Sequence, residues 1–318
     1  MRFVLDSGRR VAAHFTNTRA LWPGAEREGL VVFCHSAPGG GSFDPDPVLT
    51  QASNVTLLSV DRPGYGRSDP VFADWATVGS AADDIATVLD TLDAERVGVA
   101  GWSAGGRVAL ALAARHPDLV DRVVVVATPA PDDEVPWIDP EQRAELERLR
   151  PLSPRDAHAQ LANSLSSLVP ADPFSDDALW LLAAEGTSDK AALRSPGVRN
   201  RLGEMLRAAF SQGATGLAAD IAGYCLQPWG FEPEAVEAKT LLIYGARDPI
   251  AGLRHARWWQ ERLPNARLEL TPDAGHLVLI PTWARALSHL TPDRERVGTA
   301  SGFRIQRADS DFEEFPAA

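Results

Sequence analysis

A serine lies between two glycines in the segment Gly101-Trp102-Ser103-Ala104-Gly105, with an apolar run before it and a helical pattern after it. In such a G-x-S-x-G segment, a sharp strand-to-helix turn holds the serine hydroxyl beyond the end of the sheet, and small neighbours permit the strained backbone. The N-terminus of the following helix faces any negative charge that develops there. We therefore expect Ser103 to be a catalytic nucleophile.

Serine attacks a carbonyl efficiently only when a base removes its proton and a carboxylate orients that base. Asp248 follows the apolar run 241–244, and His276 follows the run 268–270. Loops at these two positions can bring both side chains to the end of the sheet that carries Ser103. We predict that His276 is the base and Asp248 the acid, while Asp132 or Asp133 remains an alternative source of the acid.

Eight short apolar runs alternate with helical patterns, which predicts an α/β fold with an open, mostly parallel sheet and helices on both faces. The first two runs have no helix between them and predict an antiparallel hairpin. The predicted strands are 3–5, 11–15, 30–34, 55–60, 97–100, 123–127, 241–244 and 268–270. The predicted helices between them are 80–92, 105–115, 253–263 and 282–290.

The alternation is interrupted at residues 129–238, which have helical periodicity and no convincing strand. We predict that this segment is a helical cap over the strand ends, inserted between the sixth and seventh strands of a core formed by 1–128 and 239–290. Its predicted helices are 140–149, 154–168, 176–184 and 198–224, the last with a possible break at Gly213. Residues 291–318 lose the periodicity and predict a partly disordered tail.

Two further segments have recognisable patterns. HSAPGG at 35–40 is similar to an H-G-x-P-G loop, and DRPGYGRSD at 61–69 is similar to a D-x-x-G-x-G-x-S turn. Together with the serine motif and the order Ser103, Asp248, His276, they make the sequence resemble the α/β-hydrolase superfamily over residues 30–290. Four motifs at the correct strand ends are specific for the fold, but much less specific for the substrate.

The resemblance implies an oxyanion hole formed by the backbone N–H groups of Ala37 and Ala104. It also implies a cofactor-free serine hydrolase with a helical cap, most simply acting on a carboxylic ester of a small or medium apolar molecule. One residue departs from the pattern, because Ser36 replaces the usual glycine. If its φ is positive, the serine is strained there, or its hydroxyl is instead offered to the substrate.

Other activities remain alternatives. Relatives with aspartate at the nucleophile position open epoxides or remove halogens, and Ser103 disfavours both reactions. The loop also resembles that of proline iminopeptidases, which additionally need cap carboxylates, for which Glu134 and Glu204 are candidates. Carbon-carbon bond hydrolysis, perhydrolysis or a lyase reaction would use the same three residues, and a slowly reacting ligand sensor is the least favoured possibility.

Several conspicuous residues are more simply structural. His35 is expected to form hydrogen bonds at the base of its loop, and Cys34 is expected in the core. Asp61, Arg62 and Ser68 are expected to fix a turn. The remaining histidines are expected at the surface or satisfied in the core: His14, His116, His158, His255 and His289. Large apolar residues that could line a substrate pocket are Trp180, Leu181, Phe210, Trp229 and Phe231.

Composition limits the partners. The 318 residues are 45% hydrophobic and 23% charged, which is typical of a soluble globular protein. Lys and Arg number 31 against 43 Asp and Glu, and a net charge of −12 disfavours nucleic acid and membrane surfaces. The two cysteines form neither a metal motif nor a disulfide framework, and the N-terminus lacks an apolar targeting segment, so we expect a cytoplasmic enzyme that takes a small-molecule substrate.

Overall fold

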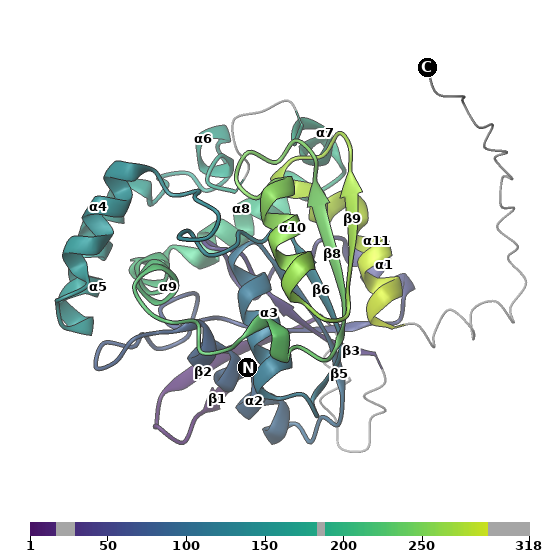
Figure 1. The fold of residues 1–318 in the computed structure, drawn as a ribbon, viewed down its shortest axis with the longest axis horizontal. Helices are drawn as coiled ribbons and strands as arrows, with labels where there is room; N and C mark the ends of the chain where they lie inside the picture. Colours follow the sequence, from purple (N-terminus) through teal and green to yellow (C-terminus); the bar gives the residue numbers. More distant parts are fainter. Residues whose placement is uncertain (17–28, 183–187, 292–318) are drawn as a thin grey trace, which may run out of the picture.

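The computed structural model describes residues 1–16, 29–182 and 188–291. An eight-stranded sheet in the order β1-β2-β4-β3-β5-β6-β8-β9 forms its centre (Figure 1). Its strands are β1 (Arg2–Val4), β2 (Arg10–Phe15), β3 (Leu30–Cys34), β4 (Thr56–Val60), β5 (Val97–Trp102), β6 (Val120–Val126), β8 (Lys239–Gly245) and β9 (Ala266–Thr271). The predicted α/β class is confirmed, and no strand end differs from its predicted position by more than three residues.

The six strands from β4 to β9 in the sheet order pair in parallel, whereas β1 and β2 pair antiparallel with each other and β2 pairs antiparallel with β4. Every residue of β3, β4 and β5 is buried. This burial explains their continuous apolar sequences, because helices cover both faces of a parallel sheet. Parallel pairing also gathers the carboxyl ends of these strands at one edge, where the predicted site residues follow them.

Two apolar layers lie on the two faces of the sheet. Helices α2 (Val78–Thr91), α3 (Ala104–Arg115) and α10 (Leu253–Arg262) pack on one face, where Trp259 is fully buried. Helix α11 (Leu279–Leu290) packs on the other face through Trp283, beside the short helix α1 (Pro47–Ala52). The sequence interpretation missed α1, although Asp46 accepts hydrogen bonds from the N–H groups of Val48 and Leu49 as a helix N-cap does.

A mainly helical segment connects β6 to β8, and its helices α4, α5 and α9 lie on the left of the sheet in Figure 1. Asp139-Pro140 and Ser153-Pro154 begin two of its helices, with side-chain N-caps and proline in the first turn. Its elements are α4 (Pro140–Leu149), α5 (Pro154–Ser164), η2 (Leu165–Leu168), α6 (Asp176–Leu179), α7 (Lys190–Arg194), α8 (Val198–Ala209), β7 (Ser211–Ala214), α9 (Thr215–Cys225) and η3 (Pro233–Ala235).

The possible break at Gly213 in the predicted helix 198–224 is confirmed, but the prediction of no strand in this segment was wrong. The four-residue strand β7 separates α8 from α9, and Gly213 within it has a φ of 62°. Ser211 donates its hydroxyl to the carbonyl of Gly66, and the Gln212 amide donates to the carbonyl of Ser68. These long-range bonds stabilise an extended conformation where local periodicity favoured a helix.

Two other predictions are only partly covered by the described residues. The predicted helix 176–184 is reduced to α6, and residues 183 and 184 lie outside the described residues. The predicted tail, apart from its first residue, also lies outside them. No helix in the described ranges is long and apolar enough to cross a membrane.

Candidate active site

Ser103 occupies a strained turn between β5 and α3. Its φ and ψ are 54° and −123°, and its N–H donates to the carbonyl of Val126 on the neighbouring strand. A Cβ atom on Gly101 would lie 2.3 Å from the carbonyl oxygen of Gly105, and one on Gly105 would lie 2.0 Å from that of Cys34. Only glycine fits at positions 101 and 105. The backbone of Ser103 lies in a sparsely populated region of φ and ψ, which stores about 1–3 kcal/mol of strain.

The loops after β8 and β9 bring the predicted acid and base to Ser103. His276 begins the short helix η4 (His276–Val278), and its Nε2 lies 3.0 Å from Ser103 Oγ. On the other side of the ring, His276 Nδ1 lies 2.8 Å from Asp248 Oδ2. The second oxygen of Asp248 accepts hydrogen bonds from the N–H groups of Ile250 and Ala251.

The charges around the hydrogen-bonded series of Asp248, His276 and Ser103 favour proton transfer from Ser103 to His276. Burial favours neutral His276, but the charge and hydrogen bond of Asp248, together with the charge of Asp189, outweigh burial and raise the pKa of the imidazole above its ordinary value. Burial likewise favours protonated Asp248, but His276 and the two backbone N–H groups lower the pKa of the carboxyl. Asp248 therefore stays charged and holds the proton on His276 Nδ1, which leaves Nε2 free to accept the Ser103 proton.

Ala37 and Ala104 flank Ser103 on the wall of one cavity. Their backbone N–H groups donate to no other group in the described ranges. Two such free N–H groups beside a nucleophile could bind a negatively charged oxygen. The structure thus leaves the predicted donors available.

The condition for backbone strain at Ser36 is not met. Its φ is not positive, so the residue needs no glycine-like backbone. Its hydroxyl donates to the carbonyl of Pro38 at 2.7 Å, inside the loop. The serine is buried and stabilises the loop through this bond, rather than presenting a free hydroxyl.

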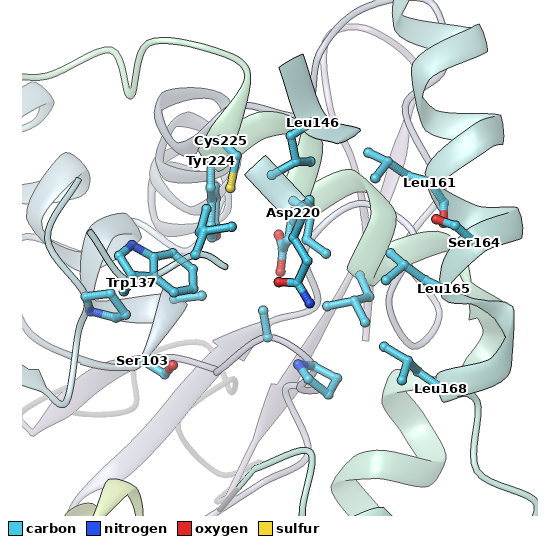
Figure 2. A pocket seen from close by; sticks show the side chains of 18 of the residues that line it. Ser103, Trp137, Leu146, Leu161, Ser164, Leu165, Leu168, Asp220, Tyr224 and Cys225 are labelled. Carbon is cyan, nitrogen blue, oxygen red and sulfur yellow. The ribbon is translucent and has the colours of Figure 1, made fainter. Parts of the chain in front are cut away.

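The cavity beside Ser103 has a volume of about 950 Å³ and extends under the inserted helices. In Figure 2, Leu161, Leu165 and Leu168 line its right side, opposite Trp137 and Tyr224. Further aliphatic side chains on its wall are Ile138, Leu146, Leu149, Leu181, Leu217, Ile221 and Ile250. Polar side chains are interspersed on the wall, among them Ser103, Ser164 and Asp220, and a cavity lined mainly by apolar side chains with some polar groups is typical of a small-molecule site.

Comparison with known proteins identifies the family. A model of the alpha/beta hydrolase fold family matches residues 29–281. The chain belongs to the alpha/beta hydrolase fold family. It is 29% identical to RutD from Caulobacter sp. (strain K31), a proposed carbamate hydrolase; the match covers 80% of this chain and 85% of RutD. It is 31% identical to the pimeloyl-[acyl-carrier protein] methyl ester esterase of Chromobacterium violaceum; the match covers 71% of this chain and 78% of the esterase.

Solved structures agree at the level of the fold. The enol-lactonase from Burkholderia xenovorans LB400 superposes with a TM-score of 0.62, covering 93% of this chain and all of its own, at 20% identity. As a member of a family whose named relatives are hydrolases, the chain is itself identified as a hydrolase.

Arg62 does more in this alpha/beta hydrolase than fix a turn. Its guanidinium donates to the carbonyls of His35 and Ser36 at 2.6 and 2.7 Å. It also binds both oxygens of Asp220 on helix α9, the shortest distance being 2.7 Å. The buried pair joins the predicted oxyanion loop to the inserted segment. Asp61 and Ser68 hold the turn itself, as expected.

Other candidate residues have structural partners. Asp132 accepts from the N–H groups of Trp137 and Ile138 and pairs with an arginine, so the structure joins Asp248 rather than Asp132 to His276. Glu134 and Glu204, the candidate amine-binding carboxylates, pair with Arg262 and Arg207. Asp133 lines a neighbouring hollow beside Asp132 and Glu134.

The remaining residues also follow the structural expectation. His35 is buried and its partners are backbone groups, and burial raises the pKa of the Cys34 thiol to about 12. The other five histidines each have a hydrogen-bond partner outside the site. Of the five large apolar candidates, only Leu181 lines the cavity with Ser103. The described residues include no group of three or more His, Cys, Asp or Glu able to hold a metal ion.

Proposed function

We propose that the protein is a serine esterase that hydrolyses a carboxylic ester with an aliphatic acyl group through an acyl-enzyme on Ser103. The observation that carries this proposal is the hydrogen-bonded chain from Asp248 through His276 to Ser103, at the wall of a largely aliphatic cavity. This arrangement has the nucleophile, base and orienting acid that acyl transfer requires.

In the first half of the reaction, His276 takes the Ser103 proton as Oγ attacks the ester carbonyl. The imidazolium that forms is stabilised by Asp248, whose carboxylate stays ionised. The N–H groups of Ala37 and Ala104 bind the oxyanion of the tetrahedral intermediate. His276 then gives its proton to the leaving alcohol, and the acyl group remains on Ser103.

In the second half, water takes the place of the alcohol. His276 removes a proton from this water, which attacks the acyl carbonyl, and the same two N–H groups bind the second oxyanion. Return of the proton to Ser103 Oγ releases the carboxylic acid. The chain's own groups supply every proton transfer in this sequence.

The cavity favours an apolar acyl group. Its wall is rich in leucine and isoleucine, and Leu161, Leu165 and Leu168 follow one another along α5 and η2 on the same side. Of the two carboxylates on the wall, Asp220 is bound by Arg62 and Glu145 is exposed. Similarity to a methyl ester esterase also supports an ester rather than a peptide substrate.

A covalent probe and a substrate panel test the proposal. A fluorophosphonate should label Ser103, located by mass spectrometry, and Ser103→Ala should abolish both labelling and turnover while circular dichroism stays unchanged. The panel contains 4-nitrophenyl esters of increasing acyl length. It also contains a prolyl arylamide, which tests for iminopeptidase activity, and a vinylogous 1,5-diketone, which tests for carbon-carbon bond hydrolysis. Labelling of another residue, or turnover of only the amide or the diketone, would reject the ester assignment.

A further inference from the structure

The buried carboxylate Asp189 contacts the catalytic loop from the inserted segment. Asp189 lies immediately before α7, and only 3% of its surface is exposed. Its Oδ2 accepts a hydrogen bond from the N–H of His276 at 3.0 Å, and its Oδ1 accepts one from the N–H of Leu277 at 2.9 Å. Both oxygens therefore accept hydrogen bonds from the backbone of the proposed base and of the residue that follows it.

The loop is shaped to receive this carboxylate. A Cβ atom on Gly275 would lie 2.5 Å from Asp189 Oδ2, so a residue with a side chain there would displace Asp189. The Trp102 indole N–H donates to the carbonyl of His276 at 3.1 Å, from the sheet side. The backbone of His276 is thus fixed through its N–H by Asp189 and through its carbonyl by Trp102.

The charge of Asp189 is not balanced by a neighbouring base. No arginine or lysine among the described residues forms an ion pair with it. Burial raises the pKa of its carboxyl, and nearby Asp248 raises it further, while the two N–H groups and His276 oppose this change. A buried carboxylate without a cationic partner is costly, which makes a purely structural purpose a poor explanation.

We propose that Asp189 is a positioning residue that holds the His276 backbone in the geometry for proton transfer and adds its charge to that of Asp248 on the imidazole. This inference rests on the proposed function. It assigns a residue of the inserted segment to the reaction, whereas the sequence interpretation places all three reacting side chains outside that segment.

The charged groups acting on the imidazole come from two sides. Asp248 contacts Nδ1 from the loop after β8, and Asp189 acts from the inserted segment through the backbone of His276. Both carboxylates raise the pKa of His276. Removing the charge of Asp189 should therefore lower that pKa and move the acid limb of the pH-rate profile to lower pH.

The test compares Asp189→Asn and Asp189→Ala with Asp172→Asn. Asp172 provides the matched control, because its carboxylate accepts a backbone hydrogen bond from Phe174 in the same inserted segment without contacting His276. Hydrolysis of 4-nitrophenyl butyrate is normalised to the sites that fluorophosphonate labels. We expect Asp189→Asn to lower kcat about 10- to 100-fold with little change in KM, because a small displacement of a catalytic group has an effect of this order. Asp189→Ala should lose more, because asparagine keeps one acceptor oxygen.

A second measurement needs no substrate. Histidine labelled with ¹³C allows the pKa of His276 to be followed by NMR, with its signal assigned by its loss in His276→Ala. The pKa should fall in Asp189→Asn and stay at the wild-type value in Asp172→Asn. An unchanged pKa in folded Asp189→Asn, or a kcat within twofold of wild type, would overturn the proposal. If the pKa of His276 falls in Asp189→Asn but the wild-type protein hydrolyses no ester, the proposed function is rejected and the role of Asp189 is retained.

Discussion

Two buried histidines lie at the carboxyl ends of the strands, and their surroundings give them opposite properties. His276, after β9, contacts Asp248, which raises the pKa of its imidazole despite burial. His35, after β3, donates to the Ser36 carbonyl and accepts from the N–H of Arg62. Burial, followed by the charge of Arg62, lowers the pKa of His35 to about 3.

This difference shows that the partner of a buried histidine, rather than its position, decides whether the ring is suited to act as a base. A carboxylate leaves one nitrogen of His276 free for the nucleophile and stabilises the charge that follows. Backbone groups occupy both nitrogens of His35, so that ring can take no proton from Ser103 without breaking a bond. The same side chain is the proposed base in one loop and a hydrogen-bonded structural residue in the other.

The largest expected effect separates the two rings directly. His276→Ala should lower kcat by about 10⁴-fold or more, because Ser103 loses its base. Steady-state hydrolysis of a 4-nitrophenyl ester measures this loss, with circular dichroism as the control for folding. Retention of kcat within tenfold would show that another group removes the serine proton.

Replacing the partner of the reactive ring should be nearly as severe. Asp248→Asn should lower kcat by up to about 10⁴-fold, because an amide favours the wrong tautomer of His276. Asp132→Asn is the matched control and should stay near wild type, since Asp132 contacts backbone N–H groups away from His276. The reverse result would assign the acid to the loop after β6.

The proposed role of the loop 35–40 in binding the oxyanion can be tested at the backbone N–H of Ala37. Ala37→Pro removes the backbone N–H proposed for the oxyanion, and loss of one such donor lowers kcat by about 10² to 10³. Ser36→Gly keeps every backbone donor and should leave kcat within about tenfold. Normal turnover in Ala37→Pro would exclude this loop from the reaction, whereas a large loss in Ser36→Gly would assign a role to the serine hydroxyl.

His35→Ala should act on stability more than on rate. The substitution leaves the buried N–H of Arg62 without its acceptor, which lowers the free energy of unfolding by about 1–3 kcal/mol. Urea denaturation followed by tryptophan fluorescence measures that change. A rate loss equal to that of His276→Ala, at wild-type stability, would contradict the structural role of His35.

The smallest effect is a pH dependence of stability with opposite signs for the two rings. Folded His35 binds a proton only near pH 3, whereas unfolded histidine does so near 6.5, so stability should fall as the pH drops below about 6.5. The raised pKa of His276 stabilises the fold at low pH, and this contribution is lost as the pH rises through its folded value. Each ring changes the slope by at most about 1.4 kcal/mol per pH unit.

Unfolding curves of His35→Ala and His276→Ala between about pH 5 and pH 8 separate the two contributions. The acid-side slope should become shallower in His35→Ala only. A wild-type slope in that variant would mean that His35 is protonated in the folded protein.

Local sequence predicted that Ser103, Asp248 and His276 lie together, because each follows an apolar strand within a recognisable motif, and the structure joins their side chains. Asp189 and Asp220 had no such signal. Asp189 contacts a backbone 87 positions away, and Asp220 binds an arginine 158 positions away, so only the tertiary fold reveals either partner. The short strand β7 was missed for the same reason, although the break itself was placed at Gly213, since the side chain of Gln212 is held by a carbonyl 144 positions earlier.

The buried pair of Arg62 and Asp220 restricts how this enzyme can be rebuilt. Protein engineers change specificity by grafting the lid of one hydrolase onto the body of another. Here a graft that lacks an acid at the position of Asp220 would leave the Arg62 guanidinium buried without its partner. Such an unpaired buried charge lowers the free energy of unfolding by about 3–5 kcal/mol. The same graft would loosen the carbonyls of His35 and Ser36, and with them the neighbouring donor at Ala37. A chimera of this protein must therefore inherit the acid and the arginine together.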